Sequence, residues 1–365
     1  MKPSAPEIFA MALLSLLILA TGLLVAYLYG SFMMRYPATG GTYMPPGMII
    51  EHNVTTEQMI DMQAVDDRRV AYDAPADAVG DQDLEPQMQG GVKVFRLETS
   101  IVRWHILPHV SVLAYAYNRQ VPGPRIRIRE GDRVRFVVQN GLPEPTTVHW
   151  HGLIVPNAMD GPADITQKPI LPGASFTYEF VAKQSGTYFY HSHDNPDRQQ
   201  DLGLYGALII EPRARRPVYD KEVDVQTGEW VQRNGKTFPA MPMEGAMPNY
   251  FTINGKSYPA TPVIHLRVGQ TLLVRFIGTS SNFIHPMHIH GGPFRVVAVD
   301  GNALTAAQQY EKDTILVGPG ERYDVVWTAR ARGKWLLHCH INHHTTNDNT
   351  EQDGAGGLTQ VIEVD

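Results

Sequence analysis

An internal repeat constrains the fold of this 365-residue chain more than any other feature. One copy reads V-P-G-P-R-I-R-I-R-E-G-D-R-V-R-F-V-V-Q-N-G-L-P-E-P-T-T-V-H-W-H-G at 121–152, and the other reads Y-P-A-T-P-V-I-H-L-R-V-G-Q-T-L-L-V-R-F-I-G-T-S-S-N-F-I-H-P-M-H-I-H-G at 258–291. Each copy has an alternating strand, a glycine turn, a second strand and then paired histidines. Alternation with a period of two, interrupted by Pro and Gly turns, favours antiparallel strands, so the repeat predicts two β-sandwiches.

The later halves of the two copies also match. P-G-A-S-F-T-Y-E-F leads to H-S-H in the first copy, and P-G-E-R-Y-D-V-V-W leads to H-C-H in the second. The spacing is 19 residues from Pro172 to His191 and again 19 from Pro319 to His338. We therefore expect the folded part to start near Val92, with a first domain at 92–213 and a second at 214–365.

The only cysteine of the chain distinguishes the second copy. Cys339 stands between His338 and His340, and His344 follows four residues after the second of these. A thiolate with nearby imidazoles suits copper, and a His2Cys set is typical of a blue-copper electron-transfer site. Because alternate residues of a strand point to opposite faces, Cys339 would hold one metal while its two neighbours reach a different centre.

Aligning the copies restricts the His2Cys site to the second domain. His285, Cys339 and His344 of the second copy correspond to Thr146, Ser192 and Asp197 of the first. Both copies keep paired histidines, namely His149 with His151, His191 with His193, His288 with His290, and His338 with His340. These imidazoles are too many for one ion, and they suit a cluster of about three coppers between a first and a second domain.

The N-terminal quarter differs in composition from the repeat. Residues 8–30 form an uncharged run of 23 residues, long enough to span a bilayer as a helix, so we expect an uncleaved membrane anchor. A cleaved secretion signal is the alternative. Residues 31–91 show no period, and the part from Glu51 to Gly90 holds ten acidic residues against Arg68 and Arg69, which predicts a flexible acidic linker.

The four histidine motifs resemble those of the multicopper oxidases. H-W-H-G, H-S-H, H-P-M-H-I-H and H-C-H with a later His occur in that family's order, over roughly 92–365. With two domains and the mononuclear motif in the second, the chain is most similar to the small, two-domain laccase-type oxidases. The resemblance implies an all-β fold with two cupredoxin-like antiparallel β-sandwich (Greek-key) domains. These would follow the N-terminal transmembrane helix and the disordered linker that the sequence itself predicts.

The same resemblance implies four coppers per chain and assigns their ligands. His285, Cys339 and His344 would hold the type 1 copper, and His149 and His288 the type 2 copper. The type 3 pair would be held by His151, His191, His193, His290, His338 and His340. Asp160 in M-D-G-P looks like the acidic position from which family members deliver protons, although a turn residue before Gly161 would read the same way.

The implied reaction couples two half-reactions. A donor, either a small phenol or a metal ion, would give electrons singly to the type 1 copper, and these would pass through Cys339 and its histidine neighbours to the cluster. There, four electrons would reduce dioxygen to two waters. The net charge of -6 argues against nucleic acid as a partner, and the single cysteine excludes an intrachain disulfide.

Two positions near the last type 1 histidine depart from the family pattern, and an acidic loop follows them. Many relatives have an axial methionine five residues after the last type 1 histidine, where this chain has Asn349; because the following loop is long, Leu358 is the alternative axial group. Thr345 stands where some relatives have a proton-delivering glutamate. Asp348, Glu351 and Asp353 of the same loop would attract a cationic donor such as Mn(II), Fe(II) or Cu(I), unless the loop is merely solvated.

The histidine pairs also bear on how the chains assemble. The paired histidines of one domain need those of the other across an interface, and three chains in a ring would supply them, as in the two-domain relatives, so we expect a homotrimer. An anchored chain would keep its catalytic domains outside the cytoplasm, periplasmic or extracellular, and a cleaved one would be secreted. The alternatives are a membrane-anchored copper-binding electron carrier or storage protein and, less favoured because of Ser192, a copper nitrite reductase.

Overall fold

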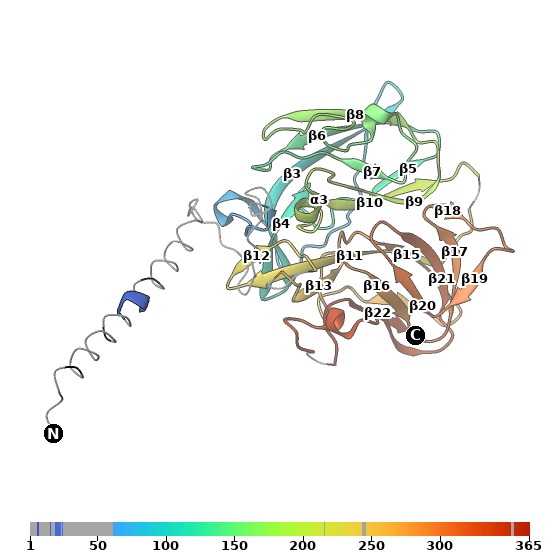
Figure 1. Cartoon of the computed structure of the whole chain (residues 1–365). Helices are drawn as coiled ribbons and strands as arrows, with labels where there is room; N and C mark the ends of the chain where they lie inside the picture. Colours follow the sequence, from blue (N-terminus) through green and yellow to red (C-terminus); the bar gives the residue numbers. More distant parts are fainter. Residues whose placement is uncertain are drawn as a thin grey trace. The chain divides into compact units, whose positions relative to one another are not determined.

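The structure of the protein is a computed structural model that describes most of the chain from Asp61 onward. The described residues are Pro6, Ser15, 19–22 and Leu24 near the N-terminus, then 61–365 except Arg215, 243–245 and 352–353. The chain divides into two compact units, Met1–Tyr43 and Met44–Asp365. All the strands that could be assigned belong to the second unit (Figure 1).

The described residues of the first unit are helical and exposed. Most of the expected anchor at residues 8–30, and residues 31–60 of the expected linker, lie outside the described residues. Within the described ranges no helix is both long and apolar enough to cross a membrane.

The first sandwich is built from two sheets. One has the order β1 (Val70–Asp73), β3 (Val92–Leu107), β6 (Arg133–Asn140) and β8 (Ser175–Val181), with β2 (Gln87–Gln89) and β4 (Val110–Tyr117) also paired to β3. The other has the order β5 (Ile126–Arg129), β10 (Tyr205–Glu211), β9 (Gly186–His191) and β7 (His149–His151). Short helical turns flank them at η1 (Asp67–Arg69), η2 (Asn157–Met159) and α3 (Pro196–Gln199).

The second sandwich repeats this plan with more strands. Its larger sheet has the order β12 (Lys236–Phe238), β11 (Lys221–Arg233), β15 (Thr271–Ile277), β21 (Arg322–Thr328), β17 (Phe294–Val299) and β18 (Asn302–Ala303), with β13 (Tyr250–Ile253) on β11 and β19 (Tyr310–Lys312) on β17. Its smaller sheet has the order β14 (Ile264–Leu266), β23 (Thr359–Val364), β22 (Gly333–Cys339), β16 (His285–Ile289) and β20 (Thr314–Val317). The turn η3 (Asn342–Thr345) follows β22.

The all-β prediction is confirmed, whereas the expectation of purely antiparallel sheets is wrong. β3 and β6 pair in parallel in the first sandwich, and so do β5 and β10. The corresponding strands of the second sandwich, β11 with β15 and β14 with β23, are parallel too. Short hairpin spacing suggested antiparallel neighbours, but these strands are joined by long connections that pass through the other sheet, which leaves them parallel.

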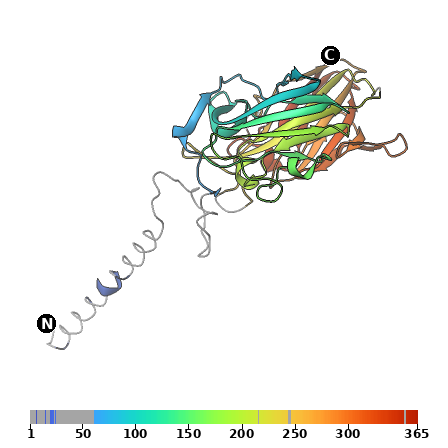
Figure 2. The same ribbon diagram turned by 90° about the horizontal axis from the view of Figure 1, so that it is seen from above.

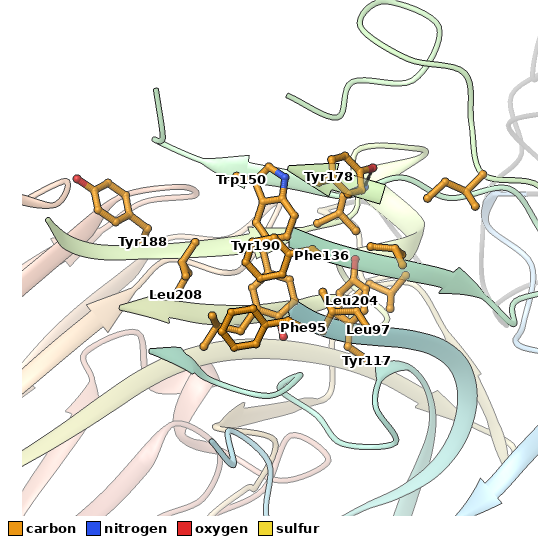
Figure 3. Close-up of a cluster of buried hydrophobic side chains, with 14 of the residues drawn as sticks. Phe95, Leu97, Tyr117, Phe136, Trp150, Tyr178, Tyr188, Tyr190, Leu204 and Leu208 are labelled. Carbon is orange, nitrogen blue, oxygen red and sulfur yellow. Dashed lines mark hydrogen bonds between the residues drawn. The ribbon is translucent and has the colours of Figure 1, made fainter. Parts of the chain in front are cut away.

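Alternating side chains from both sheets fill the core of the first sandwich. Trp150 of β7 lies against Phe136 of β6, with ring centroids 4.1 Å apart, and against Tyr190 of β9 (Figure 3). All three are completely buried. Because Trp150 points into this core, its neighbours His149 and His151 must point to the opposite face of β7.

The two sandwiches are stacked on one another (Figures 1 and 2). Trp104, in the second half of β3, packs with Trp230 of β11 in a buried cluster, and its Nε1 donates to the carbonyl of Gly255 at 2.7 Å. A second cluster joins Phe189 of β9 with Ile277 of β15. Apolar packing therefore fixes the two sandwiches against each other within the chain.

The expected linker at 31–91 is wrong for residues 61–91, which are part of the folded body. β1 pairs with residues 101–103 of β3, and β2 forms a hairpin with the start of β3. Val65 is 1% exposed in the core of the first sandwich, and its N–H donates to the carbonyl of Thr237 in the second. No period is visible in this stretch because it contributes short edge pieces and single buried side chains.

We predict that a chain starting at Gly91 is less stable than one starting at Asp61. The shorter chain loses β1 and the buried Val65 and Met62 side chains, and each such side chain contributes about 1.5–3 kcal/mol when fully buried. Thermal unfolding of the two fragments, followed by circular dichroism, measures the difference. Equal melting temperatures would contradict the role given to residues 61–90.

Candidate metal centres

The pairing of β16 with β22 distributes the second domain's candidate ligands over two faces. Met287 lies opposite Cys339, and His288 lies opposite His338. His285 and Met287 share the buried face of β16, and Cys339 lies on the buried face of β22. Paired residues point to the same side of a sheet, so His288 and His338 are together on the other, more open face.

His285, Cys339 and His344 converge on one buried point. The Sγ of Cys339 is 3.6 Å from Nδ1 of His344 and 4.0 Å from Nδ1 of His285, and the two Nδ1 atoms are 3.2 Å apart. The three side chains are 1%, 5% and 0% exposed, in the order Cys339, His344 and His285. The predicted His2Cys set is therefore assembled by β16, β22 and η3 within one chain.

The electrostatics of this set fit a metal ion. Burial raises the pKa of the Cys339 thiol to about 12 and lowers the pKa of His344 to about 3. The imidazole therefore stays neutral with a lone pair to offer, while the thiolate form needs a nearby cation. A copper ion bound between these atoms would supply the missing positive charge, and a thiolate with two imidazoles is a donor set that copper prefers.

Aromatic packing and one buried acid hold the two imidazoles. Phe251 of β13 stacks on His344 with ring centroids 4.4 Å apart and planes 24° apart. The neighbouring His343 points away, with Nε2 3.0 Å from the carbonyl of Pro248, so its role is structural. Nε2 of His285 lies 2.7 Å from Oε1 of Glu229, a residue that no spacing in the sequence singled out.

The equivalent position in the first sandwich is filled by hydrogen bonds. Oγ of Ser192 and Oγ1 of Thr146 both donate to Oε1 of Gln199, at 2.6 Å and 2.8 Å. The prediction that Asp197 corresponds to His344 is wrong, because α3 turns Asp197 outward and Gln199 inward. A neutral polar cluster has replaced the His2Cys set here, as the Ser192 and Thr146 alignment predicted.

The first histidine set, His149, His151, His191 and His193, gathers at the ends of β7 and β9. Ring centroids of neighbouring members are 5.3–6.0 Å apart. His149, His151 and His191 could share one metal ion, since each offers a ring nitrogen within 4.8 Å of the others. Burial, as the main cause, lowers the pKa of His149, His151 and His191, which keeps their ring nitrogens available to a metal.

The second histidine set, His288, His290, His338 and His340, repeats this arrangement. Its ring centroids lie 4.9–5.8 Å apart. In each set, one Nδ1 faces a backbone carbonyl from a following segment: His149 faces Asp160 at 2.7 Å, and His288 faces Asp313 at 2.6 Å. Such contacts fix the tautomer and direct Nε2 to a metal.

The two histidine sets do not meet within one chain. Among the described residues, every ring contact between two of these eight histidines joins members of the same set. His288 and His290 open instead onto a surface cavity of about 630 Å³, which Glu311, Lys312 and Asp313 also line. Each set thus looks like one half of a larger centre.

Asp160 lies beside the first histidine set, as the motif predicted. Its Oδ1 is 3.4 Å from Nδ1 of His149, and one third of its side chain is exposed. It also ends the short turn η2, directly before Gly161, so the turn interpretation describes the same residue. A partly exposed carboxylate next to a candidate ligand is suited to moving protons between water and the centre.

A turn from the second sandwich supports the first histidine set. Gly320 has a φ of +80°, and a Cβ built there would lie 2.9 Å from Cε1 of His151. Arg322 donates from NH1 to the carbonyl of Gly320 at 2.5 Å and is almost completely buried. The sequence motif P-G-E-R was visible, but its contact with His151 depends on how the sandwiches stack.

The two proposed axial positions differ in burial. Leu358 is completely buried in the same core cluster as Cys339, accepts from the N–H of Cys339 at 3.1 Å and donates to the carbonyl of His344 at 2.8 Å. Asn349 is exposed. Asp348 and Glu351 of the acidic loop are exposed as well, Thr345 is buried, and Asp353 lies outside the described residues.

These observations define a copper protein with one mononuclear site and two histidine half-centres, and comparison with known proteins agrees. Residues 99–215 and 236–350 match two family models, both described as multicopper oxidase. Laccase-1 of Cryptococcus neoformans var. grubii is 35% identical over 245 residues, or 58% of this chain and 38% of that protein. Laccase-7 of Oryza sativa subsp. japonica is 37% identical over 234 residues, or 59% of this chain and 41% of that protein.

The match to one solved structure extends over most of both chains. The blue copper oxidase from Nitrosomonas europaea is 34% identical with a TM-score of 0.69, over 75% of this chain and 86% of that one. The chain belongs to the multicopper oxidase family. Its folded part is cupredoxin-like, as expected, and the chain spans about two fifths of the length of the curated laccases it matches.

We predict that Gly320→Ala disrupts the first histidine set selectively. The added Cβ meets the His151 ring at 2.9 Å in a backbone conformation that disfavours L side chains, so the ring must move. Copper content and the type 3 absorption should fall while the blue type 1 band stays. Gly318→Ala is the matched control, because its Cβ would meet only the flexible Glu321 carboxylate at 3.2 Å; equal losses in both variants would refute the prediction.

Proposed function

We propose that this protein is an oxidase that couples the one-electron oxidation of a donor to the four-electron reduction of dioxygen to water. The observation that carries the proposal is the position of Cys339, which belongs to the buried His2Cys set while His338 and His340 on either side belong to the second histidine set. A single strand end thus joins two metal centres. When bound, copper at these centres would accept electrons singly and deliver them in fours to dioxygen.

The chain itself supplies a short route between the centres. Nδ1 of His338 lies 2.9 Å from the carbonyl oxygen of Cys339, so a hydrogen bond runs beside the covalent path from Sγ. The first set has the same contact between His191 and Ser192, at 2.8 Å, without a thiol. Only the second sandwich can therefore carry electrons along this route, which supports the second domain as the site where the donor reacts.

The donor would react near His344. His344 keeps 5% of its surface exposed, whereas His285 is completely buried, so the imidazole edge of His344 is the part of the type 1 set nearest to solvent. Neither Leu358 nor Asn349 has a thioether to offer as a further copper ligand, and the lack of one would favour a high reduction potential. The donor would be a small phenol or a metal ion, and the exposed Asp348 and Glu351 favour a cation through their charge.

Completion of the cluster would require a second chain. The two histidine sets belong to different sandwiches whose stacking leaves the second set open at the surface. If the first set of one chain docks on the second set of the next, three chains close a ring with equivalent interfaces. We therefore propose a homotrimer with one cluster at each interchain boundary.

The competing functions are less well supported by the same residues. A copper nitrite reductase has its cysteine ligand in the first domain, and Ser192 at that position is already hydrogen-bonded to Gln199. An electron carrier or storage protein has no need of eight imidazoles arranged in two matching sets.

The proposal that residues 8–30 anchor the chain, with its folded part outside the cytoplasm, is supported by their sequence alone. Retention of the chain in membranes after alkaline extraction would test it.

Oxygen uptake by the copper-loaded protein tests the proposed function. We expect uptake with at least one of a phenol, Mn(II), Fe(II) and Cu(I), four electrons consumed per dioxygen, and no hydrogen peroxide. The best donor separates a laccase-like enzyme from a metallo-oxidase. Cys339→Ser is the control, since it removes the thiolate and should abolish both the blue band and uptake. Fully loaded protein that consumes no oxygen with any donor would favour the carrier or storage function.

Complementation between two inactive variants tests the interchain cluster. We predict that His149→Ala and His288→Ala are each inactive, because each lacks one type 2 ligand. Chains co-expressed in equal amounts should recover about one quarter of the wild-type activity, since that fraction of interfaces pairs two intact sets when neighbours are drawn at random. A cluster formed within single chains would show no recovery, and simple mixing of preformed assemblies provides the negative control.

A further inference from the structure

Glu229 is a buried acid that faces the type 1 set from outside the ligand motifs. It lies in β11, 1% exposed, and its Oε1 is 2.7 Å from Nε2 of the completely buried His285. Nδ1 of the same ring is the atom that faces Cys339. The carboxylate is therefore on the side of the imidazole opposite the candidate copper position.

Neither atom of this contact has another partner. Oε1 of Glu229 and Nε2 of His285 form no hydrogen bond with any group in the described part of the chain, so their 2.7 Å contact is a close polar approach without hydrogen-bond geometry. A buried carboxylate and a buried ring nitrogen that both lack other partners would each be costly to desolvate alone. Their approach to 2.7 Å brings the two groups close enough to compensate each other electrostatically.

The same backbone pair holds both type 1 imidazoles. Glu229 of β11 is the direct cross-strand partner of Phe251 of β13, and Phe251 stacks on His344. One position of this pair thus touches the ring of His285, and the other touches the ring of His344. β11 and β13 therefore lie against both imidazoles and restrict the orientation of each ring.

A second buried acid nearby provides a contrast. Asp201, from the first sandwich, accepts from Nδ2 of Asn282 at 2.7 Å and from the N–H of Ser281 at 3.2 Å. Its oxygens are satisfied by the loop that precedes β16, and no contact joins it to His285. Of the two buried carboxylates, Glu229 is the one directed at a candidate ligand.

We propose that Glu229 is a positioning residue that orients His285 and lowers the reduction potential of the type 1 copper. Its carboxylate lies 2.7 Å from Nε2 of His285, and a negative charge at that edge of the ring favours a proton on Nε2 and leaves Nδ1 free to bind a metal. A nearby negative charge stabilises Cu(II) more than Cu(I), because the oxidised ion carries the larger positive charge.

This inference depends on the proposed type 1 copper, so the experiment measures that site directly. The copper-loaded wild type, Glu229→Gln and the matched control Asp201→Asn are titrated with redox mediators while the blue band is followed. We expect Glu229→Gln to keep the band and to favour the reduced copper at least tenfold, a rise of about 59 mV for a one-electron couple. Asp201→Asn should keep the band and change the equilibrium constant less than threefold.

The outcomes separate the two proposals. A wild type without a blue band contradicts the proposed function itself. If the wild type is blue and Glu229→Gln changes the equilibrium constant for copper reduction less than twofold, the role of Glu229 is overturned while the proposed function stands. An Asp201→Asn variant that shifts this constant as much as Glu229→Gln overturns it too. If Glu229→Gln does not fold, Glu229→Asp, which withdraws the carboxylate, is measured instead; unchanged potential and unchanged type 1 copper content would then overturn the role.

Discussion

The register between β16 and β22 is the constraint on which the metal chemistry depends. Met287 opposite Cys339 and His288 opposite His338 send one group of ligands to the buried face and the other group to the open face. A slip of one residue would exchange the faces and place a thiol in water and imidazoles in the core. Core packing of Met287, Ile289 and Leu337, all completely buried, holds this register.

The first sandwich has the same register between its two histidine strands but no thiol behind them. His149 pairs with His191 across β7 and β9, as His288 pairs with His338, so both copies present imidazoles on an open face. Behind them, the first copy has Ser192 and Thr146 bonded to Gln199 in place of a metal. Both copies therefore keep paired histidines on the open face, and only the second has a His2Cys set behind them.

The ligands and the two-sandwich fold could be predicted from the sequence because their signals are local. A histidine pair two residues apart on a strand reveals one face, and the repeat shows where each strand lies. Glu229 and Gly320 could not be predicted this way, since each touches a ligand far away in the chain. Asp197 was assigned by offset alone, and the turn of α3 moved Gln199 into that position. Residues 61–91 contribute isolated contacts without a period, so composition alone misread them.

The segment 61–67 also determines how the folded body would respond to a mechanical pull. Arg198 of the first sandwich donates to the carbonyls of Asp61 and Gln63, while Val65 and Asp67 contact Thr237 and Lys236 of the second. Tension arriving along the preceding chain would act on both sandwiches at once. The load would then be shared by the contacts that residues 61–67 make with each sandwich, and neither sandwich would bear it alone.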